Sequence, residues 1–261
     1  MFSRFIDDMK KYYHYIWYCT KSELKTEVAN SYLNWIWWIL EPMCFMIIYS
    51  FIFGTFFKAK EDMFSIFIFI GITMWNFFDS TTKNSVKLIK NNKGIVSKVY
   101  IPKHVLIFIR MGVNGVKMAI GFGIIILMMI FYQVKPTILI LYIIPILILL
   151  FLITFGVSCL LMHFGVYVED LANIWNIAMR MLFYMTGIFY NIERRAGHHL
   201  GKLLVKANPV ALALDSARDV LIYGKMPHYK YILLWIGIFL IISIFGIRLI
   251  YKNENNYIKS V

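Results

Sequence analysis

Charged residues are scarce in this 261-residue sequence, at 16% of the chain, whereas apolar residues make up 60%. Soluble globular domains carry about 25% charged residues, so this composition excludes a large soluble domain. Acidic residues are the scarcer charge, with 14 Asp and Glu against 27 Lys and Arg, which leaves a formal net charge of +13. In a chain this apolar, the basic excess indicates contact with anionic membrane lipids and a charge bias between the two sides of a membrane, not nucleic-acid binding.

Cysteine is also rare. The three cysteines, Cys19, Cys44 and Cys159, have no ligand-like spacing, and the last two lie in apolar runs. We therefore predict neither a disulfide nor a metal site. The phosphate-binding motif G-x-x-x-x-G-K-[ST] is missing, because Gly197–Lys202 has the wrong spacing. With no catalytic constellation either, we predict a chain that is not an enzyme and binds no cofactor itself.

Long apolar runs are what the sequence does contain. A helix needs about 20 apolar residues to cross ~30 Å of hydrocarbon. The runs predict an all-α integral membrane protein with about six transmembrane helices in a single domain, 1–261. The expected spans are 35–57, 64–82, 113–132, 138–166, 171–190 and 231–251. Lys117, near the start of the third span, is expected to snorkel to the interface, and Pro145 to tilt or kink the fourth.

Two further segments predict helices that lie on the membrane surface. Within residues 1–30, aromatic residues recur with helical spacing on one face and charged residues fall largely on the opposite face, which is typical of an interfacial amphipathic helix. In the connection 191–228, Asn208-Pro209 fits an N-cap followed by proline at the first helical position. The helix that follows carries an apolar stripe, with Arg218 on the opposite, polar side. We expect short helices at the outer membrane face.

The basic residues of the connections orient the predicted spans. Most fall on the side of the N-terminus, so we predict a multi-pass protein of a bacterial inner (plasma) membrane with both termini in the cytoplasm. The exception is 191–228, a basic connection on the outer side. On the inner side, segment 83–104 is basic and weakly amphipathic. It is either a solvated loop or a short helix that docks on a cytoplasmic partner.

Arg180 is the most informative charge, because it falls near the middle of the fifth predicted span, about 15 Å from Asp170. A charge there is costly and should face protein, water or substrate. One interpretation is a structural pair with Asp79 or Glu41, or with backbone carbonyls. The other is an anion-contacting residue that lines a pathway. The residues alone leave both open.

Aromatic residues recur in the first span at intervals of 7, 4, 4 and 3, so they form one stripe: Trp38, Phe45, Tyr49, Phe53 and Phe56. Aromatic faces stack on sugar rings, so the stripe fits a surface that guides a glycan. It equally fits helix packing or contact with lipid. We include Tyr184 of the fifth span in the same predicted pathway.

The order and spacing of several short motifs resemble a known family, the membrane subunits of ATP-binding-cassette exporters of the O-antigen, capsule and teichoic-acid type. The similarity covers nearly the whole chain. The motifs are Tyr32–Trp35 leading to Leu40-Glu41-Pro42, Gly71–Trp75, Lys98–Lys103, Phe164–Asp170, and Asn208-Pro209 followed by Arg218. Two positions depart from the family pattern: Glu169, where a basic residue is common, and Asn34, where glycine is usual.

This resemblance implies a homodimer of permeases bound to two ATPase subunits, which would hold ATP and Mg²⁺. It implies a polyprenyl-diphosphate-linked glycan as substrate. The implied ATPase-coupling segment contains Lys87, Lys90, Asn91, Asn92, Lys93, Gly94 and Lys98. The implied outer gate contains Arg194, Arg195, Lys202, Asn208, Pro209 and Arg218. A competing function is a membrane-embedded transferase acting on lipid-linked sugars, which would use Glu169-Asp170 and His163.

Overall fold

The computed structural model describes residues 2–29, 32–56, 63–192 and 198–260, and within these ranges every regular element is helical. The predicted all-α membrane fold is thereby confirmed. In the described ranges, five helical segments are long and apolar enough to cross a membrane: Trp37–Gly54, Phe64–Val86, Lys103–Phe131, Ile138–Tyr167 and Tyr229–Tyr257. The fifth predicted span, 171–190, contains a shorter helix, α8 (Leu171–Met185), which is about 22 Å long.

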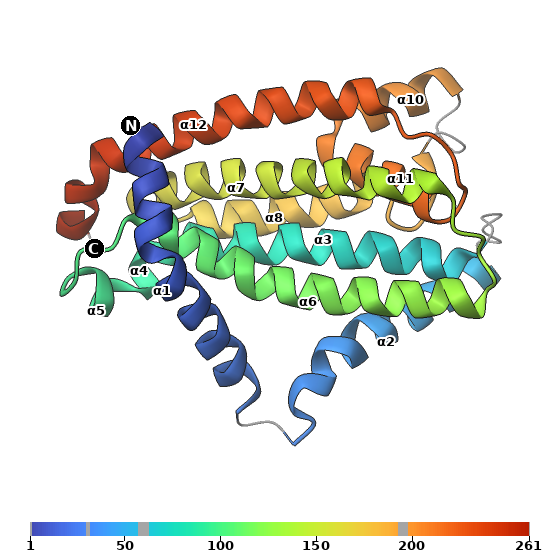
Figure 1. Ribbon diagram of the computed structural model, residues 1–261, viewed down its shortest axis with the longest axis horizontal. Coiled ribbons are helices and arrows are strands. Elements are labelled where there is room, and N and C mark those ends of the chain that lie inside the picture. The colour runs from blue at the N-terminus through green and yellow to red at the C-terminus, as the bar shows by residue number, and fades with distance from the viewer. Residues whose placement is uncertain (1, 30–31, 57–62, 193–197, 261) are drawn as a thin grey trace.

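Four long helices run side by side as the body of the molecule (Figure 1): α3 (Phe64–Val86), α6 (Lys103–Phe131), α7 (Ile143–Tyr167) and α12 (Tyr229–Ser260). The most enclosed is α3, in which every residue from Ile66 to Trp75 is buried. It packs between α6 and α7, and α12 packs along α7. Gly246 of α12 permits that contact, because a Cβ there would lie 2.6 Å from the Cβ of Cys159.

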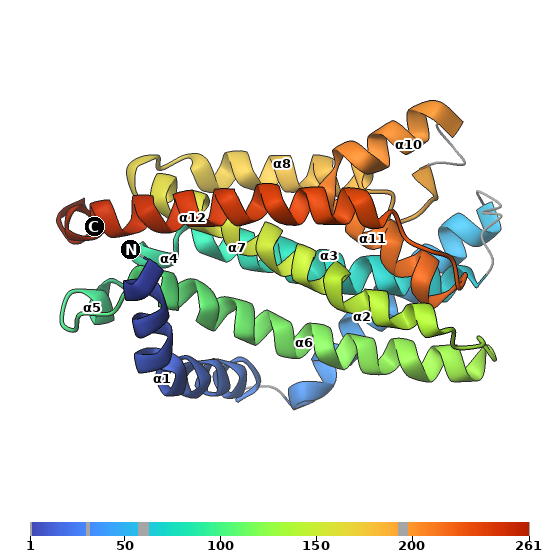
Figure 2. The ribbon, with the colours of Figure 1, turned by 45° about the horizontal axis from the view of Figure 1, so that its top comes forward.

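Both termini lie at one end of the bundle, together with α4 (Leu88–Asn91) and α5 (Lys93–Val96). We call this the terminal end. At the opposite end lie α10 (His198–Ala207) and α11 (Pro209–Leu221), as Figures 1 and 2 show. The inner docking segment and the outer helices predicted from sequence are therefore separated by the full length of the bundle.

The N-terminal helix α1 (Phe2–Val28) lies across the outside of α6. Its exposed rings include Tyr13, Trp17 and Tyr18, as expected of an interfacial helix. Its charged side is not free in water, however. Glu23 and Glu27, one turn apart, form ion pairs of 2.9 and 2.6 Å with Arg110 and Lys117 of α6.

Those ion pairs explain why the third predicted span, 113–132, begins too late. The helix starts at Lys103, directly after Pro102, and carries Arg110 and Lys117 within its length. Lys117 therefore lies in the middle of α6, paired with Glu27, and does not snorkel from its start. A charge is tolerated there because an acidic residue of α1 forms an ion pair with it. A hydropathy pattern does not reveal such a pair.

Proline acts differently in two helices. Pro145 occupies the first turn of α7, where an N–H has no intrahelical partner in any case, so the expected kink has no cause. The first part of that predicted span is instead a 3₁₀ segment, Ile138–Tyr142 (η3). Pro42 lies inside α2 (Trp37–Phe51), which continues as a π-helical segment, Ile52–Phe56 (η2). Within the fully described α2, only Met46 is buried.

Candidate functional site

A cavity of about 360 Å³ lies between α2, α3 and α8. We call it the pathway cavity. Its charged lining comes from all three helices: Glu41 of α2, Asp79 and Lys83 of α3, and Arg180 of α8. Four residues of the sequence-predicted pathway meet here, namely Arg180, Phe45, Tyr49 and Tyr184. Helices distant in sequence thus bring the predicted aromatic stripe and the predicted intramembrane arginine to one place.

Arg180 has no ion pair in the part of the chain that the structure describes, and its side chain is exposed. Asp79, one of its two expected structural partners, is instead engaged by Lys83, whose Nζ lies 2.8 Å from Oδ2. Glu41 lines the same cavity without forming a salt bridge to Arg180. Among the described residues Arg180 therefore has no structural counter-ion, and its side chain lines the cavity.

An aromatic cluster continues from the cavity towards the opposite end of the bundle. Its centre is Phe189, a residue that the sequence reasoning did not single out. The ring centroid of Phe189 lies 4.5 Å from that of Tyr49, 4.7 Å from that of Phe53 and 5.2 Å from that of Phe183. Phe189 follows the end of α8, outside any helical repeat, so no periodicity in the sequence points to it.

The predicted stripe on the first span is only partly one surface. Phe45, Tyr49 and Phe53 face α8 and Phe189, and the rings of Phe45 and Tyr49 stack with centroids 5.9 Å apart. Trp38 instead faces α6, where the Nζ of Lys117 lies 5.9 Å from its ring centroid. Pro42 lies between the two groups within the continuous helix α2. The side chain of Phe56 lies outside the described residues.

A second cavity of about 290 Å³, the side cavity, lies between α2, α3 and α6. Glu41, Asn76 and Asp79 line both cavities, so the two share one polar wall. The buried Oγ1 of Thr73, which also lines the side cavity, has no hydrogen-bond partner within the described residues. Polar side chains inside a membrane-spanning bundle are costly, and a lining of this kind is typical of a water-filled or substrate-filled space.

Arg218, predicted as part of an exposed outer gate, is buried at 2% exposure. Its Nε donates to the carbonyl of Phe67 at 3.1 Å, and its Nη1 and Nη2 donate to the carbonyls of Gly187 and Ile188 at 2.9 and 3.0 Å. The prediction of a polar, outward-facing Arg218 is therefore wrong. The chain leaves helical geometry at Gly187, which has a φ of +67°, and Arg218 supplies the donors that those carbonyls lack.

The rest of the predicted outer gate is placed as follows. The Oδ1 of Asn208 accepts hydrogen bonds from the backbone N–H groups of Val210 and Ala211, at 3.1 and 3.2 Å, and Pro209 is the first residue of α11. The predicted N-cap is confirmed. Lys202 is half-buried on α10. Arg194 and Arg195 lie outside the described residues.

At the terminal end, the predicted coupling segment forms two short helical turns, not one helix. Leu88, Ile89 and Val96 are buried and attach these turns to the bundle. The predicted coupling residues alternate with them on the surface: Lys87, Asn91, Lys93, Gly94 and Lys98 are exposed, and Lys90 and Asn92 are half-buried. The segment thus presents a basic surface on a firmly anchored base.

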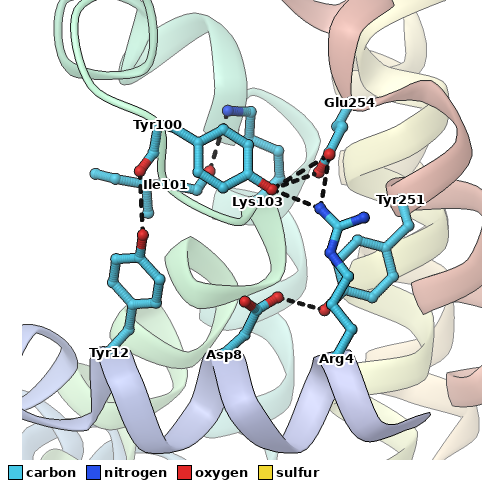
Figure 3. A network of polar contacts seen from close by, with 8 residues as sticks. All are labelled: Arg4, Asp8, Tyr12, Tyr100, Ile101, Lys103, Tyr251 and Glu254. Carbon is cyan, nitrogen blue, oxygen red and sulfur yellow. Dashed lines mark hydrogen bonds and ion pairs between the residues drawn. The ribbon is translucent and has the colours of Figure 1, made fainter. Parts of the chain in front are cut away.

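Tyr100 connects this segment to both ends of the chain (Figure 3). Its hydroxyl lies 2.6 Å from Nη2 of Arg4 on α1 and 3.2 Å from the carboxylate of Glu254 on α12. Arg4 also donates to Glu254 at 2.7 Å, and this hydrogen bond raises the pKa of Arg4. Nearby, the hydroxyl of Tyr251 donates to Asp8 at 2.6 Å. Figure 3 shows α1 and α12 joined around the segment that follows α5.

The profile of the ABC-2 type transporter family matches residues 14–222. The chain belongs to this family. Among its relatives, two proteins from Klebsiella pneumoniae, each named O-antigen export system permease protein RfbA, are 24% and 25% identical over 234 and 235 residues, 89% of each chain. A Myxococcus xanthus protein of the same name is 19% identical over 224 residues, 86% of each chain.

Family membership makes this ABC-2 chain a membrane-spanning transport subunit and implies an ATP-binding-cassette partner. The competing transferase gains no support from the geometry. His163 is engaged by Tyr257, with 2.7 Å between Nδ1 and the hydroxyl. Among the described residues of this ABC-2 protein, no group of three or more His, Cys, Asp or Glu is placed to hold a metal ion.

Proposed function

We propose that the chain is the permease subunit of an exporter that moves a polyprenyl-diphosphate-linked polysaccharide across the inner (plasma) membrane. The substrate class is an O-antigen, capsule or teichoic-acid polymer, and a separate subunit hydrolyses ATP. Relatives named for O-antigen export support the substrate class. The observation that carries the proposal is the pathway cavity, where an unpaired arginine lies beside aromatic rings.

The charges of the pathway cavity suit an anionic group at one point and neutral sugars elsewhere. Lys83 pairs with Asp79, so among the described residues that line the cavity Arg180 is the cation without an ion pair, and a diphosphate bound to it would share the cavity with the carboxylate of Glu41. Phe45, Tyr49 and Tyr184 line the same cavity and offer ring faces, and the buried Phe189 packs against Tyr49 and Tyr184 from behind. Ring faces bind sugars by stacking without demanding one arrangement of hydroxyls, so a polymer can advance across them.

A second copy of the chain would complete the passage. Beside the cavity, α2 and α8 expose large apolar side chains, among them Phe51, Ile177, Met181 and Met185. A two-fold contact through this face would place two pathway cavities and two Arg180 side chains around one axis. This face supports our proposal of a homodimer bound to two ATPase subunits.

Energy would enter at the terminal end, which we place in the cytoplasm with both termini. The exposed lysines around α4 and α5 would dock on the ATPase, where ATP and Mg²⁺ are bound. Movement of this segment would reach α1 and α12 through Tyr100, and α3 directly, because α4 follows α3 without a loop. Rigid-body displacement of these helices would change the width of the passage.

Co-purification of the full chain with its ATPase subunit tests the proposal. We expect the wild-type chain to retain the ATPase through affinity purification in mild detergent and to support ATP hydrolysis by it. The double variant Lys87→Glu, Lys98→Glu should release the ATPase, because it reverses two exposed charges of the docking surface. Lys135→Glu, an exposed charge reversal at the opposite end, is the matched control.

An ATPase retained equally by both variants would contradict the docking surface. A wild-type chain that binds no ATPase would contradict the exporter itself. Accumulation of lipid-linked glycan on the inner side in cells that lack the chain, and its relief by the wild-type gene, tests the substrate class separately from assembly.

A further inference from the structure

A third cavity lies on a face of the bundle that takes no part in the pathway cavity. It has a volume of about 540 Å³ and is formed by α6, α7 and α12, with Phe5 of α1 at its border. Figure 2 shows α6 and α12 on either side of α7, with α1 across the terminal half of α6. Phe108 and Phe155, whose ring centroids are 4.8 Å apart, belong to its wall. We call this cavity the α6–α12 groove.

The groove is almost wholly apolar. Ser243 is its one polar lining residue, and the rest are aliphatic or aromatic. The helices that form it are three of the segments able to cross a membrane, so hydrocarbon and not water is the surrounding medium. A roomy apolar cavity does not retain water, because it offers too few hydrogen-bond partners. A hydrocarbon chain fills such a groove without any polar cost.

A line of side chains on α12 continues from the groove towards the terminal end. Leu240 and Ile244 line the groove, and Arg248 and Lys252 follow at the same spacing of four residues, each about 40° further round the helix axis, so Arg248 lies one turn beyond Ile244 at the edge of the groove. Arg248 comes 19 residues after Tyr229, the first residue of α12. That rise is about 28 Å, close to the ~30 Å thickness of the hydrocarbon.

Arg248 therefore lies at the level of the lipid headgroups. Both Arg248 and Lys252 are exposed, and within the described residues neither forms an ion pair or a side-chain hydrogen bond. Other cations on this face do have acidic partners: Arg4 has Glu254 and Arg110 has Glu23. Two unpaired cations, one and two turns beyond Ile244 at the edge of an apolar groove, match a phosphate attached to a hydrocarbon chain.

We propose that the α6–α12 groove binds one acyl chain of an anionic phospholipid from the leaflet at the terminal end, with the lipid phosphate held by Arg248 and Lys252. The site is formed by different residues from the pathway cavity, so it does not depend on the identity of the exported substrate. The bound lipid would fill the space that Phe5 borders, and so support α1 against the bundle.

Native mass spectrometry of the full chain tests this site. The protein is reconstituted in nanodiscs that contain equal amounts of phosphatidylglycerol and phosphatidylcholine, and the lipids that stay bound after release are counted. We expect one phosphatidylglycerol to be retained by the wild-type chain. Arg248→Ala with Lys252→Ala should lower its occupancy about tenfold or more, because two cations near the phosphate are lost.

Two further variants separate the headgroup from the groove. Ile244→Trp fills the groove and keeps both cations, and it should also abolish retention, while Lys230→Ala removes a charge from the opposite end of α12 and should leave retention unchanged. Equal retention of phosphatidylcholine, or loss of the lipid in Lys230→Ala to the same degree, would overturn the proposal. Retention of a polyprenyl phosphate in place of a phospholipid, in protein extracted from cells, would also overturn the proposal.

Discussion

The guanidinium of Arg218 lies over the ring of Phe67, with 3.6 Å between its central carbon and the ring centroid. The same guanidinium donates to three backbone carbonyls from two separate segments. Arg218 thus joins α11 to α3 and to the end of α8, the helix that carries Arg180. Arg218, which the sequence predicted to be a surface charge, therefore fixes the position of α8, the helix that contributes Arg180 to the pathway cavity.

Replacing Arg218 with methionine should destabilise the protein by about 3–5 kcal/mol, because buried carbonyls lose their donors together. Gly71→Ala should act in the same direction, since a Cβ at Gly71 would lie 2.5 Å from Nη2 of Arg218. Thermal unfolding of the purified chain in detergent measures both. Lys202→Met, on neighbouring α10, is the control, and equal loss of stability there would count against a special role for Arg218.

Arg180→Glu should abolish export while leaving assembly with the ATPase intact, because the cation available to the substrate's diphosphate becomes an anion. Arg180→Lys should retain part of the activity, since it keeps the charge but loses bidentate contact. Export is measured as glycan on the cell surface, and assembly by gel filtration. Normal export by an assembled Arg180→Glu protein would rule out contact between Arg180 and an anionic group.

Tyr100→Phe should weaken communication between the coupling segment and the rest of the bundle. It removes the hydroxyl that meets Arg4 and Glu254 and keeps the ring, so the fold should lose no more than about 1–2 kcal/mol. We expect slower export per ATP hydrolysed, with normal binding of the ATPase. Tyr13→Phe, on the exposed side of α1, is the matched control, and an unchanged ratio of export to hydrolysis in Tyr100→Phe would refute the connection.

Gly165→Ala and Gly94→Ala should differ sharply in their effect on the yield of folded protein. A Cβ at Gly165 would collide with the carbonyl oxygen of Val86, so α3 and α7 would have to separate next to the coupling segment. A Cβ at Gly94 meets no other atom within 4 Å. We expect Gly165→Ala to prevent stable accumulation and Gly94→Ala to be neutral, as measured by folded yield from membranes. Similar yields would show that the α3–α7 contact is adaptable.

Local features of this protein were predictable from its sequence, because they depend on neighbours in the chain. Asn208 and Pro209 begin α11 as expected, since an N-cap needs only the next three residues. The apolar runs likewise located the membrane helices. Arg180 was recognised as unusual because its depth in the span follows from a simple count of residues.

Features that depend on distant contacts were not predictable. The amphipathic pattern of α11 placed Arg218 on its polar side, but the three carbonyls to which it donates are 30, 31 and 151 residues away. The hydropathy pattern predicted that Lys117 lies near the start of its helix, because the sequence does not reveal that Glu27 of α1 pairs with it. Periodicity also joined Trp38 to Phe45, because residues seven apart lie close together on an ideal helix, but in the structure Trp38 lines the side cavity and Phe45 lines the pathway cavity.

The length of α12 has a practical consequence. Its 32 residues rise about 48 Å, whereas ~30 Å suffices to cross the hydrocarbon, so the last turns project from the membrane as a rigid extension. That extension carries Glu254, which holds Arg4, and the buried Tyr257, which meets His163. A truncation that ends at the membrane surface would therefore remove the contact between Glu254 and Arg4, although the ion pairs of Glu23 and Glu27 with α6 would still hold the rest of α1.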